Sequence, residues 1–556
     1  MQGREFFKKY EIRNMKNVIR KLPVFLLPLL ILGIYLLFRA NLISQDSWKV
    51  ILGFSFSFAF ALSLVPFRDD FNFKVPKKFE KWLPYIIVGL GCFVYAIYGL
   101  VNHFHFQTHA YDFGFFDQVI WKLSRFKNPS STIIFINHFL CDHFQPILYL
   151  VAPIYWIYNH PTTLILFEIS IVCLGSLPIF WLAKKKFEGA LLPAILALTY
   201  IFFVGNQYAL AFTFHPSTLF ATLFLFAFYF FEKKKYFWHF VFVFLALMCK
   251  ENVGLYIAAL GIYYLVKKRI IGLIHLILGP LWFYLAWKIL PPLFGEVPTY
   301  HYDYFPLGAH PLEAIKTILT RPFYTLFLIF NHPIKIETLL ILFGSFGFLA
   351  FLTPSFLIVA LTMLGERFFS AVELKWVMGF HYGAPISAIL ILSIIDAVIY
   401  LKNRIKFPWE FFISGFLLLN LGAMTYLTQA PLHNLVLHPS FYKSTPSIQS
   451  AHKALKLIPK NASVSAQEDF VPHLAHRDEI YEFPNGLGSV QFLFLDVLGN
   501  TYPLKREEYA QYIKKVLENS DYGIKFNEKS VVVFEKGLKS EIKPSQELTN
   551  VSQGIF

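Results

Sequence analysis

Apolar runs long enough to cross a lipid bilayer recur along this sequence, and they constrain its fold more than any other feature. A transmembrane helix needs about 20 mostly apolar residues. The chain has 556 residues, of which 56% are hydrophobic and 15% charged, against roughly 25% charged in soluble domains. We therefore expect a polytopic α-helical membrane protein with about 13 transmembrane helices. The expected spans lie near residues 22–40, 48–67, 82–101, 162–183, 189–206, 217–232, 236–250, 252–267, 270–290, 337–353, 354–365, 382–401 and 409–427.

Clusters of lysine and arginine separate these runs and orient them. If the runs are spans, the basic clusters all fall on one side of the membrane: the N-terminal segment, 68–81, 184–186, 233–235, 267–269 and 402–406. Basic residues favour the cytoplasmic side. We therefore interpret the net charge of +15 as topology rather than nucleic-acid binding, and expect a multi-pass protein of the cell (plasma or inner) membrane with a cytoplasmic N-terminus.

This orientation places three loops and the C-terminal part of the chain outside the cytoplasm. The loops are 102–161, 291–336 and 366–381, provided that the short apolar run 147–158, interrupted by Pro153, lies at the membrane interface instead of crossing. Residues 440–556 are less apolar and predict a soluble α/β domain, with a hairpin whose turn is Asn527 and Glu528. We thus expect three parts: 1–81, a basic N-terminus with two extra spans; 82–430, the main transmembrane domain; and 440–556, an extracytoplasmic domain.

Two carboxylates in the first of these loops are the candidate catalytic residues. They are Asp112 and Asp117, in the stretch YDFGFFDQ. Ionisable residues near membrane depth are costly and are usually functional. Asp112 also suits an N-cap for a helix that starts at Phe113, and the two interpretations are compatible. On a helix Asp117 would point about 140° away from Asp112, so the two should not form an acid/base dyad.

Eight further residues are candidates for substrate binding because each places a charge, an imidazole or a phenol on the outer side of an apolar run. A metal site is one interpretation of His138 and Asp142, which are four residues apart; contact between a histidine and a sugar or phosphate is the other. Lys250 and Glu251 suit either a self-paired turn or an anion-binding site. The full set is His138, Asp142, His143, His215, Lys250, Glu251, His381 and Tyr382.

An ordered set of motifs carries a family resemblance from about residue 82 to about 535. These motifs are YDFGFFDQVIWKL, HFQPILYLVAPIYWIYNHPTTLILFEI, FTFHPSTLF, CKENVGLY, HYGAP and IPKNASVSAQEDFVPHLAHRDEIYEFP. Together they resemble a family of prokaryotic predicted membrane proteins, catalogued as a domain of unknown function and grouped with the GT-C glycosyltransferases. The resemblance implies a GT-C-like fold and transfer, with inversion, of a sugar from a polyprenyl-phosphate donor to an extracytoplasmic acceptor.

The same resemblance assigns roles to residues. It implies that Asp112, or Asp117 as second choice, is the general base, and that basic residues hold the lipid phosphate. By their position alone, Lys250, His215 and His381 are the candidates for binding phosphate or sugar. The loop lacks the paired acids of protein mannosyltransferases, so no cofactor is certain and a divalent metal ion stays an open alternative.

Two other function classes remain open. One is a lipid or glycolipid transporter or flippase, a class of protein that usually has polar groups near the membrane midplane. The other is a non-catalytic glycolipid-binding protein, since a fold does not imply a function. The partners we expect are the polyprenyl-phosphate sugar donor and membrane lipids, and no nucleic acid.

Overall fold

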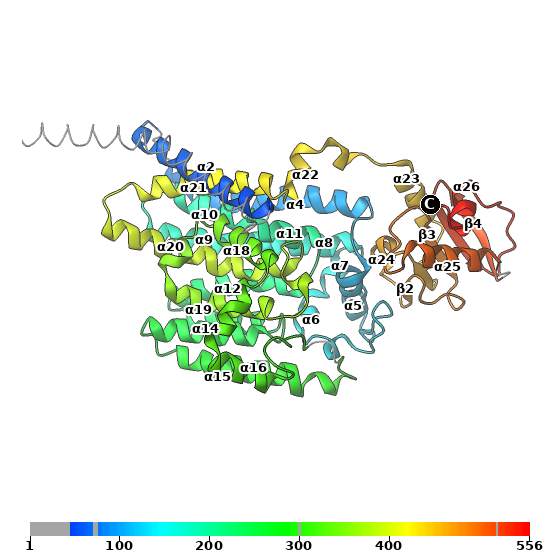
Figure 1. The fold of residues 1–556 in the computed structure, drawn as a ribbon, viewed down its shortest axis with the longest axis horizontal. Coiled ribbons are helices and arrows are strands. Elements are labelled where there is room, and N and C mark those ends of the chain that lie inside the picture. The colour runs from blue at the N-terminus through cyan, green and yellow to red at the C-terminus, as the bar shows by residue number, and fades with distance from the viewer. Residues whose placement is uncertain (1–44, 71–75, 299–301, 519–520) are drawn as a thin grey trace, which may run out of the picture.

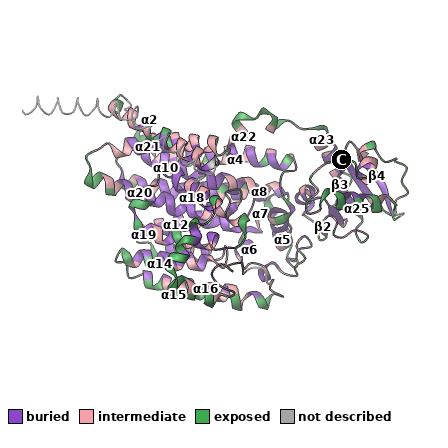
Figure 2. Ribbon diagram, viewed as in Figure 1, coloured by how far each residue is buried: buried purple, intermediate pink, exposed green. Residues whose placement is uncertain are grey.

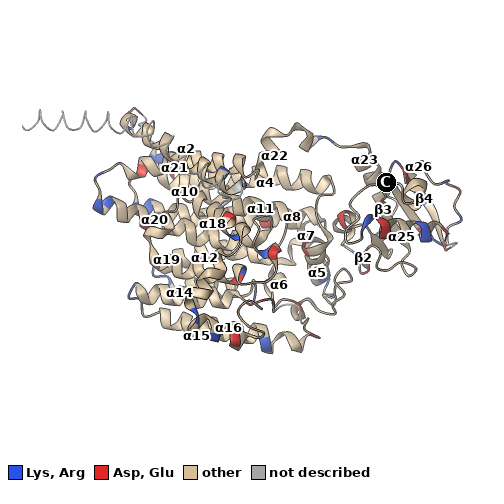
Figure 3. Ribbon diagram, in the orientation of Figure 1, with Lys and Arg blue, Asp and Glu red and all other residues tan. Residues whose placement is uncertain are grey.

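The chain forms a helical body with a small mixed sheet near its C-terminal end (Figure 1). The computed structural model describes residues 45–70, 76–298, 302–518 and 521–556, so the apolar run 22–40 lies outside the described residues. Buried residues fill the middle of the helical body (Figure 2), and most of its ribbon is free of lysine, arginine, aspartate and glutamate (Figure 3). The body is therefore built from apolar helices, as the sequence predicts.

The helices follow the predicted apolar runs closely. The N-terminal half of the body holds α2 (Gln45–Leu64), α3 (Lys77–Glu80), α4 (Leu83–Phe104), α5 (Phe115–Ser124), α6 (Ile147–Val151), α7 (Ile154–Ile157), α8 (Pro161–Leu174), α9 (Ser176–Lys186), α10 (Leu191–Ile201), α11 (Val204–Phe212) and α12 (Pro216–Glu232). The rest holds α13 (Tyr236–Leu247), α14 (Val253–Val266), α15 (Gly272–Tyr284), α16 (Pro311–Thr320), α17 (Pro322–Phe330), α18 (Pro333–Ser345), α19 (Pro354–Phe368), α20 (Ala384–Arg404), α21 (Trp409–Leu427) and α22 (Leu432–Leu437).

Fewer of these helices qualify as membrane spans than we expected. Among the described residues, seven helical stretches are long and apolar enough to cross a bilayer, and some of them join two consecutive helices, such as α8 with α9 and α10 with α11. The number is eight if the bent pair α17 and α18 counts as one span. The helices α12, α13 and α14 are shorter; 14 residues of α14 extend about 21 Å, less than the roughly 30 Å hydrocarbon core. The expected number of 13 is therefore not confirmed. The run 147–158 forms the short helices α6 and α7, with Pro153 at the break between them.

Glycines let two of the helices approach closely. In α14 and α15, a Cβ added to Gly279 would lie 2.3 Å from the Gly254 carbonyl oxygen, and one added to Gly254 would lie 2.4 Å from that of Gly279. Small residues at helix contacts are a common means of association inside membranes, where apolar side chains gain little from leaving lipid. The pairing of these two helices thus depends on the absence of side chains.

The C-terminal α/β region is a five-stranded sheet with helices around it. The strand order is β2-β1-β3-β5-β4, with β1 parallel to β2 and β3, and β5 antiparallel to β3 and β4. The predicted hairpin is present as β4 and β5, but its turn lies at Lys529 and Ser530, while Asn527 and Glu528 belong to β4. The strands are β1 (Val464–Ala466), β2 (Ile480–Glu482), β3 (Phe492–Asp496), β4 (Tyr522–Glu528) and β5 (Val531–Lys536), and the helices are α23 (Pro446–Leu455), α24 (Val471–Leu474), α25 (Arg506–Glu518) and α26 (Gln546–Ser552).

The loop that follows α4 joins the helical body to this region. The Thr132 hydroxyl donates to the Ile480 carbonyl at 2.6 Å and accepts from the Ile480 amide at 3.0 Å. On α23, the His452 ring nitrogen Nε2 lies 2.9 Å from the Phe104 carbonyl at the end of α4. Segments separated by more than 300 residues therefore meet around residues 102–161, the loop that carries the candidate catalytic acids.

Candidate functional site

Asp112 lies in a tight turn just before α5, in a conformation that few residues adopt. Its φ of 61° and ψ of −81° are not helical, and it belongs to the turn Ala110–Gly114. The residue that precedes α5 is Gly114, and no side chain caps that helix. The prediction that Asp112 is an N-cap is therefore wrong. A side chain held at positive φ costs about 1–3 kcal/mol and is concentrated at functional sites.

The Asp112 carboxylate is surrounded by titratable groups without bonding to them. Burial raises its pKa to about 6; the charge of Lys250 acts against this shift, Asp142 adds to it, and His109 acts against it. The residue is partly exposed, and within the described residues its side chain makes no hydrogen bond or ion pair. A carboxylate with a pKa near neutrality and a free oxygen can accept a proton from a bound substrate.

Glu251, which follows Lys250 in the chain, forms a partly buried pair with His143. The His143 Nδ1 and Glu251 Oε1 atoms are 2.9 Å apart, and the Phe144 amide donates to Glu251 Oε2 at 3.3 Å. The pKa of Glu251 falls to about 2 because its interactions with His143 outweigh the effect of burial. Since Glu251 is bonded to His143, Lys250 is not self-paired with it; in the described part of the chain Lys250 makes no ion pair. The self-paired turn is therefore wrong, and the lysine is available to a ligand.

Two histidines that precede helices stack on each other next to Lys250. The rings of His215, before α12, and His381, before α20, have centroids 3.6 Å apart and are nearly parallel. His215 Nδ1 accepts from the amide of Ser217, while Nδ1 of His381 is buried and has no partner among the described residues. Desolvation and nearby positive charge lower the pKa of His215 well below its usual value, so this ring is neutral at pH 7.

Two of these groups, Lys250 and His381, line one pocket. Its wall includes Lys250, Glu366, Arg367, His381 and Tyr382. Asp112 is close enough to act electrostatically on Tyr382 as well as Lys250. The pocket therefore has two cationic side chains and the carboxylate of Glu366 in its wall, and Asp112 lies within electrostatic reach of two of its residues.

Glu366 and Arg367 belong to this wall and were not among the predicted site residues. The Tyr256 hydroxyl donates to Glu366 at 3.2 Å. Arg367 is 3% exposed; it donates to backbone carbonyls between residues 375 and 377, and its Nη1 has no partner in the described structure. Glu366 and Arg367 come at the end of an apolar run, and the same pattern made Lys250 and Glu251 candidates. The sequence therefore held a signal that could have identified Glu366 and Arg367 as site residues.

Two predicted site residues lie elsewhere. Asp117 is fully buried in α5, where it accepts a hydrogen bond from the Tyr155 hydroxyl and lies 3.1 Å from Nε2 of His476. His138 Nδ1 accepts from the Leu140 amide, and neither His138 nor Asp142 belongs to a three-residue group of metal-ligating atoms in the described residues. Asp117 and His138 therefore each have a bonding partner within the protein.

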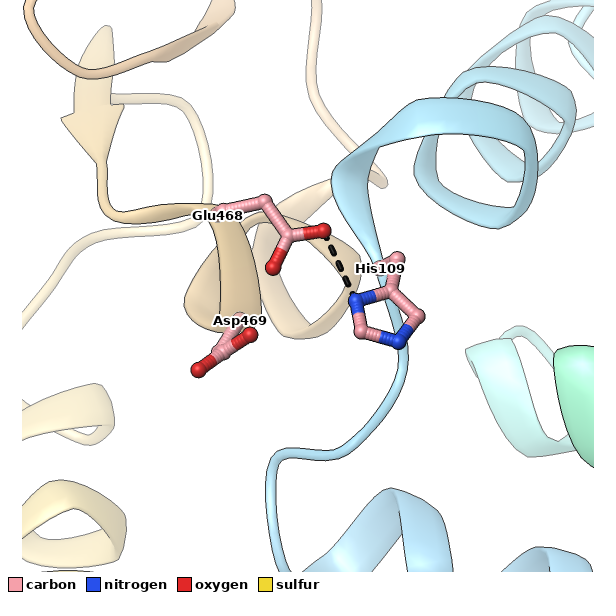
Figure 4. Close-up of side chains that lie close together, drawn as sticks. All are labelled: His109, Glu468 and Asp469. Atoms are coloured by element: carbon pink, nitrogen blue, oxygen red, sulfur yellow. Dashed lines mark hydrogen bonds and ion pairs between the residues drawn. The ribbon is translucent and has the colours of Figure 1, made fainter. Parts of the chain in front are cut away.

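A second cluster lies where the loop meets the C-terminal region (Figure 4). His109 Nδ1 is 2.8 Å from Glu468 Oε1, and Asp469 follows Glu468 in the chain. The Asn500 amide donates to both carboxyl groups, at 3.0 and 3.3 Å. Burial and the neighbouring Glu468 raise the pKa of Asp469 to about 8. Ligand atoms of His109, Glu468 and Asp469 lie within 4.8 Å of one another, which suits a metal ion.

The apolar helices and the charged pocket among them define a membrane protein. The chain belongs to the family of predicted membrane proteins described as DUF2079, whose model matches residues 102–533. A comparison with curated proteins finds no match. The family description carries no activity, so any function has to be argued from the site.

Proposed function

We propose that this protein is a membrane glycosyltransferase of GT-C type, which transfers a sugar from a polyprenyl-phosphate donor to an acceptor outside the cytoplasm. The observation that carries the proposal is the position of Asp112, an unbonded and partly exposed carboxylate within electrostatic reach of Lys250, which lines a pocket together with Glu366 and Arg367. A base next to an anion-binding pocket is the arrangement that transfer from a phosphate leaving group requires.

Each group has one role in the reaction. The acceptor hydroxyl attacks the anomeric carbon of the donor sugar while Asp112 takes the hydroxyl proton. The bond between that carbon and the phosphate oxygen breaks, and its electron pair leaves with the polyprenyl phosphate. Lys250 and Arg367 stabilise the negative charge on the leaving phosphate, and His381 and Tyr382 contact the phosphate or sugar. The new bond forms on the opposite face of the sugar, so the configuration inverts.

The topology and domain division are part of the same proposal. In it, residues 82–430 form the transmembrane domain, the loop 102–161 faces away from the cytoplasm, and residues 440–556 form an extracytoplasmic domain over that loop. The basic clusters support this orientation because all of them fall on the other side.

The test is transfer of a labelled sugar from polyprenyl phosphate by the purified protein in detergent or nanodiscs. We expect Asp112→Asn to lower transfer by about 100- to 10,000-fold. Asp478→Asn is the matched control, because Asp478 is exposed and pairs with Lys127 on the surface. Donor binding without transfer in the wild type would favour a non-catalytic glycolipid-binding protein, and the absence of donor binding would favour a transporter of other cargo.

A further inference from the structure

The cluster of His109, Glu468 and Asp469 has the composition of a metal site and lies outside the pocket described above. It joins two parts of the chain: His109 lies in the loop three residues before Asp112, and the two acids follow β1 of the C-terminal region (Figure 4). One ligand atom of each residue lies within 4.8 Å of the other two. Nitrogen and carboxylate ligands of Zn²⁺ lie about 2.0–2.2 Å from the ion, so binding would draw these three atoms closer together.

Among the described residues, His109 is the potentially cationic side chain that is paired with these acids. The side chain of Glu468 is 5% exposed and faces His109, and the Asn500 amide, which is neutral, bridges Glu468 and Asp469. Within the described residues, no lysine or arginine contacts either acid. A divalent cation can bind both of these neighbouring carboxyl groups in their ionised form, in place of a proton.

The ligand set indicates the kind of cation. One imidazole nitrogen with two carboxylates suits Mn²⁺ or Zn²⁺, whereas Mg²⁺ and Ca²⁺ prefer oxygen ligands alone. His109, Asp469 and Asn500 also border an open pocket. This space gives the ion an entry path and room for the water molecules that complete its coordination.

We propose that His109, Glu468 and Asp469 bind one divalent ion of the Mn²⁺ or Zn²⁺ type, which ties the segment carrying Asp112 to the C-terminal α/β region. The binding site itself rests on these three residues. The effect of the ion on catalysis rests on the proposed function, because in that proposal the ion would fix the turn that holds Asp112, the general base. His109 is close enough to act on Asp112 electrostatically, so the site and the pocket are neighbours.

The experiment measures metal binding to the full-length protein in detergent after chelator treatment, by calorimetry with Mn²⁺ or Zn²⁺ alone. We expect one ion per chain, tighter binding of Zn²⁺ than of Mn²⁺, and at least tenfold weaker binding in Asp469→Asn and in Glu468→Gln. Asp478→Asn, which changes an exposed acid of the same region, should bind as the wild type does. Wild-type protein that binds neither ion, or an Asp469→Asn variant that binds as tightly as the wild type, would overturn the proposal.

A spectroscopic readout keeps the test valid if the acidic variants fail to fold. Pulsed electron paramagnetic resonance of Mn²⁺ bound to the wild type should show coupling to one imidazole nitrogen, and a spectrum without nitrogen coupling would refute the site. Because no sugar donor is present in either measurement, failure of sugar transfer leaves the metal result standing. Conversely, a protein that transfers sugar but binds no metal ion would refute only the metal site.

Discussion

The pH dependence of sugar transfer is the sharpest test of the role of Asp112. A general base works only when it is ionised, and burial among apolar and aromatic groups raises the pKa of this carboxyl to about 6. The ionised fraction is then roughly 90% at pH 7 and roughly 10% at pH 5. We therefore expect kcat/KM to rise about tenfold from pH 5 to pH 7 and to level off above that, if the acceptor hydroxyl does not titrate in this range.

Substitution of Lys250 should shift the pH profile of sugar transfer in a defined direction. The charge of Lys250 lowers the pKa of Asp112, so Lys250→Met should move the rising part of the profile to higher pH. A shift of one pH unit corresponds to about 1.36 kcal/mol of interaction between the two groups. Because Lys250 also contacts the leaving phosphate in our proposal, each profile has to be normalised to its own maximum.

The assay is transfer of labelled sugar from polyprenyl phosphate, followed at subsaturating donor from pH 5 to pH 8 in wild type, Lys250→Met and Asp112→Asn. The Asp112→Asn variant should lose the rising limb together with most of the activity. A wild-type profile that is flat between pH 5 and pH 7 would refute the assignment of Asp112 as base. A profile that moves to lower pH in Lys250→Met would refute the electrostatic argument.

Three further predictions concern stability, measured as the midpoint of thermal unfolding in detergent. Glu251→Gln should lower the free energy of unfolding by about 1–3 kcal/mol because it breaks a partly buried, charge-assisted bond to His143. The pKa of Glu251 is lowered to about 2. The stabilisation from this bond is therefore present above about pH 4.5 and is lost as the pH falls toward 2. Gly279→Ala should cost about 1–3 kcal/mol because its methyl group collides with the backbone of α14, whereas Gly422→Ala, with open space around it, should be neutral. Asp117→Asn should destabilise by about 1–3 kcal/mol because it weakens a fully buried bonding network.

Each of these has an outcome that contradicts it. Glu251→Gln with an unchanged midpoint at pH 7 would show that the pair is not formed in the protein. Equal midpoints for Gly279→Ala and Gly422→Ala would mean that α14 and α15 are farther apart than described. For Asp117→Asn, intact stability combined with lost transfer would return this residue to the catalytic role that its burial argues against.

The apolar runs and strand patterns predicted the secondary structure well because those signals are local. The hairpin of β4 and β5 was predicted from the runs YGIKF and SVVVF, and its turn was wrong by two residues: β4 continues through Glu528, and Lys529 makes the turn at positive φ. The number of spans was a weaker prediction. Helices such as α14 are apolar but short, and hydropathy alone does not distinguish a short span from a buried helix.

For the candidate site, too, some features follow from the local sequence and others follow only from contacts between distant segments. The sequence by itself determined that the chain is a helical membrane protein and that charged residues such as Lys250 and His381 interrupt its apolar runs. Only the tertiary structure decided which of them meet: Asp112 lies with Lys250 beside the pocket, whereas Asp117, five residues away, is buried against Tyr155.

The physical reason is that hydropathy and periodicity act over a few turns of one element, while a site is made by contacts between distant segments. His109 and Glu468 are separated by 359 residues, and nothing local in either segment signals the other. The turn at Asp112 is a further case, because its positive φ is held by the surrounding structure and follows from no preference of the residue itself. The sequence thus determines where polar groups interrupt the apolar chain, and packing determines which of those groups act together.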